Sequence, residues 1–208
     1  MKPQVDYTLY LVTDQGLMST STLEEAVEAA CKGGVTLVQI REKHASDDDF
    51  LDVARRCKAV TDAYGVGLII NDNPQVAAQV GALGVHVGQD DTPVPQVRAI
   101  VGPDAIIGVS AHSVEEAVRA REEGADYLGI GGITRTATKP EAAALSFEEL
   151  DAIMDASQLP CVAIGGVNAK TIPACKEHSF AGYAVVSAII AQPNIEQAAR
   201  DLLAVIKN

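Results

Sequence analysis

The feature that most constrains the fold is a regular alternation of short apolar runs with longer amphipathic segments along the chain of 208 residues. Each apolar run is rich in aliphatic and β-branched residues, which is typical of strands buried in a parallel sheet. Each intervening segment carries apolar residues at helical spacing. The predicted strands are 7–12, 35–40, 68–70, 84–87, 106–109, 126–130, 161–164 and 183–186.

Helix start signals recur between these runs. Ser21 or Thr22 predicts the start of a helix that runs to Lys32. Ser46 and Ser146, like these two residues, are followed by acidic residues that favour a first helical turn. Ser113 with Glu116 predicts a capping box, in which the two side chains bond each other's backbone N–H groups. Asn168 predicts the start of a helix that continues to about Glu177.

Eight strand–helix units with short connections predict an α/β fold, a single (β/α)8 TIM barrel. Because no linker or shift in composition divides the chain, residues 1–208 are expected to form one catalytic domain. An open doubly wound sheet is the alternative, but no Gly-x-Gly-x-x-Gly motif follows the first predicted strand.

The net charge of −12 at pH 7 argues against nucleic acid and anionic membranes as partners. Anionic substrates must therefore be attracted by a local site. The N-terminus lacks a signal-peptide core, and no apolar run is long enough to span a bilayer. The four cysteines lack metal-ligand spacing, so we expect reduced thiols in a cytoplasmic protein. The sequence does not fix the oligomeric state and is compatible with a homo-oligomer.

The second predicted strand ends in charged residues. Side chains alternate between the two faces of a strand, so Gln39, Arg41 and Lys43 point the same way. Two cations and an amide on one face favour a phosphate or diphosphate site. A surface ion-pair cluster with Glu42 is the alternative.

Polar residues also follow other predicted strands, where a barrel holds its active site. They are Asn71, Asp72, His86, Gln89, Asp91, Ser110, Thr136, Thr138 and Lys139.

Two of these residues are carboxylates at adjacent strand ends. Asp72 and Asp91 could provide a Mg²⁺ site together with water and phosphate oxygens. Each could instead cap the helix that begins at the following proline, and Asp90 is a competing ligand.

The last two strands are followed by a second predicted anion site. Gly166 follows the seventh strand, and Val186 and Ser187 end the eighth. Barrels often bind phosphate through backbone N–H groups of these two loops. Two anion sites at one mouth suggest two phosphorylated reactants. We interpret His86 as structural and His112 as a loop residue, and we find no nucleophile beside a base, which favours chemistry by positioning and electrostatics.

The motifs together resemble those of the thiamine-phosphate synthase family. They span 34–43, 71–72, 84–91, 108–112, 136–139 and 162–167, in order along nearly the whole chain. The resemblance implies a (β/α)8 barrel that joins a hydroxymethylpyrimidine diphosphate to a thiazole phosphate. Thiamine phosphate and diphosphate would be the products, and a carboxylated thiazole would also lose CO₂.

The resemblance also implies roles for individual residues. It assigns to the pyrimidine diphosphate Gln39, Ile40, Arg41, Glu42, Lys43, Asn71, Ser110 and Lys139. It assigns to the thiazole phosphate Thr136, Ala137, Thr138, Gly166, Val186 and Ser187. Mg²⁺ would bind Asp72 and Asp91, and the residues expected to act in catalysis are Arg41, Lys43, Ser110 and Lys139. The implied mechanism is dissociative, through a pyrimidinylmethyl cation.

Two alternatives share parts of this pattern. A related thiazole tautomerase carries a histidine where this chain has Gly132, and a catalytically silent phosphate-binding protein would not need the diphosphate residues. The loop after the sixth strand departs from the family, because Gly132 replaces a proline and Thr134 an aromatic ring. We therefore expect a mobile loop between Thr134 and Ala144. Arg135 either faces solvent or contacts the thiazole substrate.

Overall fold

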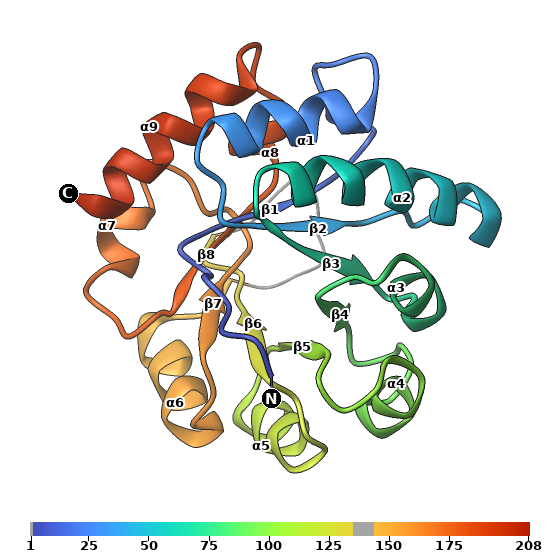
Figure 1. Ribbon diagram of the computed structural model, residues 1–208. Helices are drawn as coiled ribbons and strands as arrows, with labels where there is room; N and C mark the ends of the chain where they lie inside the picture. Colours follow the sequence, from blue (N-terminus) through green and yellow to red (C-terminus); the bar gives the residue numbers. More distant parts are fainter. Residues whose placement is uncertain (1, 135–143) are drawn as a thin grey trace.

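The eight apolar runs form eight parallel strands that pair in chain order, and the last pairs with the first to close a barrel. The computed structural model describes residues 2–134 and 144–208. Figure 1 shows the strands in the middle and the helices around them. The strands are β1 Leu9–Val12, β2 Leu37–Ile40, β3 Gly67–Asn71, β4 Gly84–Val87, β5 Ile106–Ala111, β6 Tyr127–Ile130, β7 Cys161–Ala163 and β8 Gly182–Val185. The predicted TIM barrel is confirmed.

Most predicted helix starts are also confirmed. Thr22 and Ser146 each form a complete capping box, and Ser46 accepts a hydrogen bond from the N–H of Asp49. The helices are α1 Leu23–Lys32, α2 Asp47–Ala63, α3 Pro74–Val80, α4 Val94–Val101, α5 Val114–Glu122, α6 Phe147–Ser157, α7 Ile172–Cys175, α8 Ser187–Ile190 and α9 Ile195–Lys207. None of those described is both long and apolar enough to cross a membrane.

Two local predictions were wrong. The carboxylate of Glu116 accepts from the backbone N–H of His112 and not from that of Ser113, so the predicted capping box is only half formed. The helix expected from Asn168 is only the short α7, which begins at Ile172. The Asn168 side chain instead donates to the carbonyl oxygen of Gly166, which stabilises the turn after β7.

Side chains alternate between two apolar cores along each strand. Tyr10 and Val12 of β1 belong to a core inside the barrel, with Leu37, Ile69, Ile106, Tyr127, Val162 and Ala184. Leu9 and Leu11 face outward into the larger core, where the strands pack against the helices. All four cysteines are buried and free in the outer core, which agrees with the expected reduced thiols.

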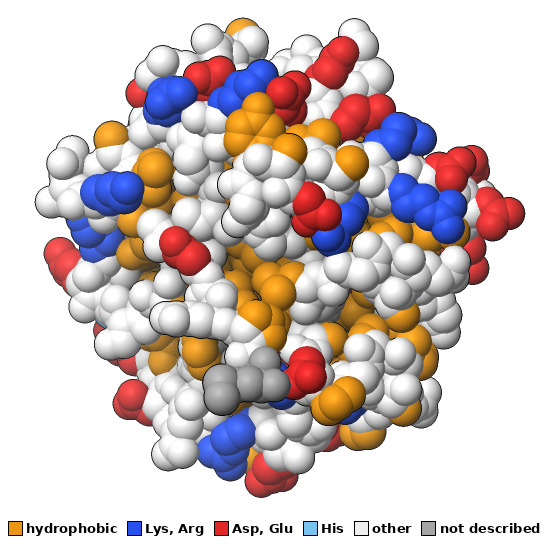
Figure 2. Space-filling model, viewed as in Figure 1, with side chains coloured by type: hydrophobic (Ala, Val, Ile, Leu, Met, Phe, Trp, Pro, Cys, Tyr) orange, Lys and Arg blue, Asp and Glu red, His pale blue; other side chains and the backbone are white. Residues whose placement is uncertain are grey.

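The N-terminal segment lies against the barrel at the end where the strands begin. In Figure 1 it crosses in front of the strands, and Lys2 pairs with Asp126 just before β6. Tyr7 packs into the inner core, and its carbonyl oxygen accepts from the N–H of Tyr183. Figure 2 shows hydrophobic side chains near the centre of this face and charged side chains of both signs around its rim. The N-terminal segment thus lies over the end of the barrel at which the strands begin, opposite their carboxyl ends.

Gly182 is predicted to hold the N-terminal segment in place by lacking a side chain. A Cβ atom at this position would lie 1.8 Å from the carbonyl oxygen of Tyr7. Gly182→Ala should therefore lower the free energy of unfolding by about 1–3 kcal/mol, measured by urea denaturation. The matched control is Ala181→Ser at the exposed neighbouring position, which should change it by less than about 0.5 kcal/mol. Equal denaturation midpoints for Gly182→Ala and the wild type would contradict the packing argument.

Candidate active site

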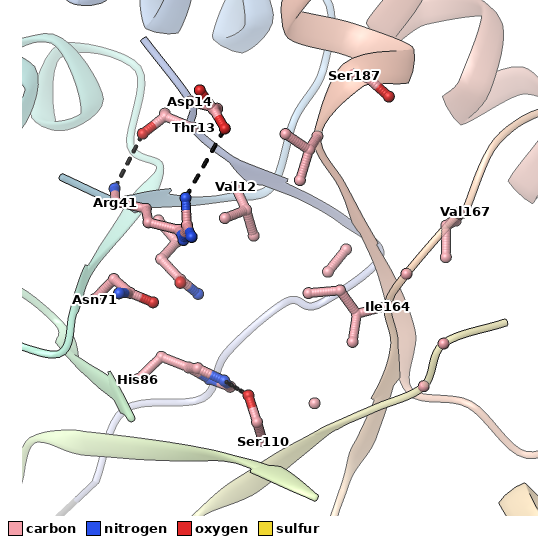
Figure 3. A pocket seen from close by; sticks show the side chains of 18 of the residues that line it. Val12, Thr13, Asp14, Arg41, Asn71, His86, Ser110, Ile164, Val167 and Ser187 are labelled. Carbon is pink, nitrogen blue, oxygen red and sulfur yellow. Dashed lines mark hydrogen bonds and ion pairs between the residues drawn. The ribbon is translucent and has the colours of Figure 1, made fainter. Parts of the chain in front are cut away.

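A cavity of about 140 Å³ opens at the carboxyl ends of the strands. Each strand, or the residue directly after it, contributes to its lining. Figure 3 shows Arg41, Asn71 and His86 on one side, and Ile164 and Ser187 on the other. Closure of the barrel therefore brings together side chains that are far apart in sequence. They form two walls of the cavity, one polar and the other more apolar.

Seven of the predicted site residues line this cavity. They are Gln39, Arg41, Asn71, Ser110, Gly166, Val186 and Ser187. Ile40 does not, because its side chain is fully buried in the outer core between barrel and helices. Lys43, Asp72 and Asp91 form a cluster of their own beyond the lining residues. Thr136, Ala137, Thr138 and Lys139, as well as Arg135 and most of the loop expected to be mobile, lie outside the described residues.

The end of β2 is held against the end of β1. The backbone N–H of Arg41 donates to the Thr13 hydroxyl at 3.1 Å, and its guanidinium lies 3.8 Å from a carboxylate oxygen of Asp14. Figure 3 shows both contacts at the edge of the cavity. Our sequence analysis missed Thr13 and Asp14 as site residues. The signal was available, since both directly follow a predicted strand, as do the residues that it identified.

Glu42 points away from the cavity lining. One of its carboxylate oxygens, Oε1, is buried and has no hydrogen-bond partner among the described residues. Burial raises the pKa of this carboxyl above its usual value, and the nearby Asp14 adds to the increase. The side chain is thus a partly buried acid with one poorly solvated oxygen.

Asp72 and Asp91 face each other across the ends of β3 and β4, and Lys43 closes the group. The Lys43 ammonium lies 2.5 Å from Asp72 Oδ2. Burial raises the pKa of Asp72, and Asp91 adds to this although Lys43 opposes it. Burial acts in the same direction on Asp91, but hydrogen bonds from Asp72 and from the N–H of Gly88 outweigh it and lower the pKa of Asp91. The two carboxylates are therefore close enough to shift each other's pKa, and Lys43 is the cation that pairs with Asp72.

Neither carboxylate caps a helix. Asn73 caps α3, because its side chain accepts from the N–H of Val76 at 2.9 Å. The N-cap of α4 is Pro93 without a side-chain hydrogen bond, and Asp91 instead accepts from the N–H of Gly88 at 2.7 Å. The capping alternative for both aspartates is thus wrong. Asp90 is exposed, whereas Asp91 is the residue that contacts Asp72.

The turn after β7 forms the opposite wall of the cavity. Gly165 and Gly166 have φ angles of 86° and 81°, which favour glycine. A Cβ atom at Gly166 would lie 2.0 Å from the hydroxyl oxygen of Thr134, so the turn after β6 packs directly on this one. Hydrogen bonds from Asn168 and Thr171 fix the Gly166 carbonyl. The tight packing leaves backbone without side chains beside the cavity, as close approach of an anion requires.

A buried chain of hydrogen bonds lies below the cavity. The Gln39 amide nitrogen donates to the Tyr10 hydroxyl at 2.7 Å, and the hydroxyls of Tyr10 and Tyr127 lie 2.9 Å apart. The Tyr127 hydroxyl lies 2.9 Å from Nδ1 of His86, whose Nε2 lies 2.9 Å from the Ser110 hydroxyl. Both ring nitrogens of His86 are thus engaged, which agrees with the structural interpretation of this residue.

Comparison with known proteins identifies the family. A family model described as thiamine monophosphate synthase matches residues 9–189. The chain belongs to the thiamine monophosphate synthase family. The thiamine-phosphate synthase of Ruminiclostridium cellulolyticum is 53% identical over 208 residues, covering 100% of this chain and 99% of the relative. That of Clostridium botulinum is 48% identical, covering 97% and 95%.

Solved structures agree with membership of the thiamine monophosphate synthase family. The thiamine phosphate pyrophosphorylase of Pyrococcus furiosus matches with a TM-score of 0.89 and 32% identity, covering 97% of this chain and 96% of that one. A 3-hexulose-6-phosphate synthase matches with a TM-score of 0.66 and 18% identity, covering 95% and 99%. The second similarity shows the fold alone.

The neighbours Asp72 and Asn73 should differ in what they do for stability. Asn73→Ala removes the cap of α3 and should lower the free energy of unfolding by about 1 kcal/mol. Asp72→Asn should change it by less than about 0.5 kcal/mol, because Asp72 caps nothing and asparagine tolerates its φ of 60°. Urea denaturation without divalent cations, which could bind the wild type, measures both. A loss for Asp72→Asn as large as that for Asn73→Ala would contradict the assignment.

Proposed function

We propose that this chain is a transferase that joins the pyrimidine diphosphate and the thiazole phosphate to give thiamine phosphate and diphosphate. The observation that carries the proposal is a single cavity with cationic and amide side chains on one wall and a glycine turn without side chains on the other. Arg41 and Gln39 lie on one wall, and Gly166, Val186 and Ser187 lie on the other. Two phosphorylated reactants could therefore meet between the walls, and the relatives are named thiamine-phosphate synthases.

The wall formed by β2 to β5 suits the pyrimidine diphosphate. Gln39, Asn71 and Ser110 offer amide and hydroxyl groups to a polar ring, and Arg41 is placed at the edge for phosphate. In the proposed complex, the thiazole phosphate would take the Gly166 side, aided by Thr136 and Thr138. Ile40 and Glu42 would contribute through their backbone, since neither side chain lines the cavity.

Asp72 and Asp91 are the residues that would hold Mg²⁺. Two carboxylates that face each other supply hard oxygen ligands, and Mg²⁺ commonly takes one or two carboxylates together with substrate phosphates. Among the residues that the structure describes, no group of three or more His, Cys, Asp or Glu side chains is placed to hold a metal ion. In the proposed site, oxygens of substrate and water would complete the coordination. When bound, the ion would neutralise negative charge on the leaving diphosphate.

The proposed chemistry needs positioning and charge more than a nucleophile. Departure of diphosphate would leave a pyrimidinylmethyl cation, which the thiazole nitrogen then captures. Arg41 and Lys43 would stabilise the charge that grows on the diphosphate as its bond breaks. Lys139 and Ser110 are proposed to act with them, and a carboxylated thiazole would lose CO₂ afterwards.

A cytoplasmic location also stays a proposal, supported by the four free cysteines.

Turnover should require a divalent cation and both carboxylates. The wild type, mixed with both phosphorylated substrates and Mg²⁺, should release diphosphate and form thiamine phosphate, and EDTA should abolish this until Mg²⁺ is restored. Asp72→Asn should lose at least about a hundredfold in kcat while remaining folded. Full activity of Asp72→Asn would overturn the metal assignment. A wild type that makes no product from these substrates would overturn the function itself.

Lys43 should act on the leaving group more than on binding. Lys43→Ala should reduce kcat by about 10- to 1000-fold and change KM for the pyrimidine diphosphate much less, because the charge it stabilises grows in the transition state. The control is Lys58→Ala on α2, which removes another lysine that pairs with an aspartate, Asp62, also at 2.5 Å. It should leave both constants unchanged. An increase in KM with unchanged kcat for Lys43→Ala would contradict this role.

A further inference from the structure

The chain of hydrogen bonds below the cavity joins two residues of the proposed pyrimidine wall. Gln39 stands at one end and Ser110 at the other, with Tyr10, Tyr127 and His86 between them. The two tyrosines are 1% and 0% exposed, so their hydroxyls must find partners inside the barrel. Neither tyrosine lines the cavity, and neither was identified from the sequence.

The chemistry of the five groups gives this chain a direction. The amide nitrogen of Gln39 can only donate, so the Tyr10 oxygen accepts from it. The proton of Tyr10 must then go to its other partner, Tyr127. Tyr127 in turn donates its own proton to Nδ1 of His86. A neutral imidazole that accepts at Nδ1 carries its proton at Nε2, which donates to the hydroxyl oxygen of Ser110.

The direction determines what each end offers to a ligand. Because the nitrogen of the Gln39 amide is used by Tyr10, its oxygen is left as an acceptor for the cavity. Because the Ser110 oxygen accepts from His86, its proton is left as a donor. Burial raises the pKa of Tyr10 and of Tyr127, so both hydroxyls keep their protons at neutral pH.

The backbone is shaped to hold these groups. A Cβ atom at Gly108 would lie 2.2 Å from the Tyr127 ring and 2.5 Å from Nδ1 of His86. Glycine inside a strand is otherwise unfavourable. Gly108 therefore makes room for the side chains of Tyr127 and His86 at some cost in stability. Ser110 is also fixed from outside the barrel, because its carbonyl oxygen accepts from Gln89 at 2.5 Å.

We propose that Tyr10 and Tyr127 are positioning residues that make the site select a pyrimidine with an amino group and not an oxo group. In an aminopyrimidine the exocyclic group donates and the adjacent ring nitrogen accepts, which matches an acceptor at Gln39 and a donor at Ser110. In the 4-oxo analogue the exocyclic oxygen accepts and the ring N–H donates, so both contacts are reversed. This inference rests on the proposed function and adds the source of its substrate preference.

Interrupting the chain of hydrogen bonds should weaken the preference for the aminopyrimidine. Tyr127→Phe keeps the ring and removes the hydroxyl, so that Gln39 can flip and Ser110 can rotate to suit either ring. The measured quantity is the ratio of kcat/KM for the amino and the 4-oxo pyrimidine diphosphates, with saturating thiazole phosphate. We expect a ratio of at least about 100 for the wild type and a decrease of about tenfold for Tyr127→Phe.

A matched control separates this effect from packing. Tyr7 lies in the same inner core, with its ring centre 4.8 Å from that of Tyr127, and its hydroxyl is not part of the chain. Tyr7→Phe should leave the ratio unchanged. If Tyr127→Phe fails to fold, Tyr10→Phe interrupts the chain of hydrogen bonds one step earlier and should lower the ratio in the same way. An equal loss with both pyrimidines, which leaves the ratio at its wild-type value, would overturn the proposal.

A second measurement needs no substrate. The ¹⁵N shifts of the histidine rings, with His86 assigned by its absence from His86→Gln, report which nitrogen carries the proton. We expect a proton at Nε2 and none at Nδ1 in the wild type. A proton at Nδ1 would reverse the direction of the chain and overturn the proposal. If the wild type made no thiamine phosphate, the proposed function would fail, and this spectrum would still decide the direction.

Discussion

Closure of eight parallel strands into a ring satisfies the backbone hydrogen bonds of every strand within the sheet, and it brings all the carboxyl ends to one mouth. The register of the ring then decides which side chains become neighbours. Asn71 pairs with His86, and His86 with Gly108, whose missing side chain leaves room for the His86 ring. The site is therefore a consequence of closure, since these residues are far apart in sequence and no local element brings them together.

Closure also means that polar side chains inside the barrel must find hydrogen-bond partners within the protein. The interior is too narrow for water to solvate many polar groups, so each polar side chain that points inward needs a partner from another strand. The hydroxyls of Tyr10 and Tyr127 and the ring of His86 meet this demand by bonding to one another, and their two outer partners, Gln39 and Ser110, emerge at the cavity. The hydrogen bonds that stabilise the core thus extend into the groups that would face a ligand.

The sequence predicted the elements well because their signals are local. Thr22 and Ser146 cap α1 and α6, the helices that directly follow them, and the eight apolar runs form the eight strands. Predictions failed where a polar side chain bonded to a nearby backbone group other than the one that a helix cap would use. Asn168 bonds to Gly166 in the β7 turn and so does not begin a helix. Likewise, the strand-end rule found Gln39, Arg41 and Ser110, but not the buried tyrosines, whose alternation pattern is that of ordinary core residues.

The charges at the mouth explain how an acidic protein can accept anionic substrates. Each cation at the end of β2 already has an acidic partner: Asp14 lies 3.8 Å from Arg41, and Asp72 lies 2.5 Å from Lys43. These pairs are partly exposed, so each is worth little and can be exchanged. They hold the cations in place and prevent their repulsion, yet a diphosphate can displace a carboxylate because it carries more charge. In the proposed complex, release of Lys43 would leave Asp72 beside Asp91 without a cation, which would favour entry of the proposed metal ion together with the diphosphate.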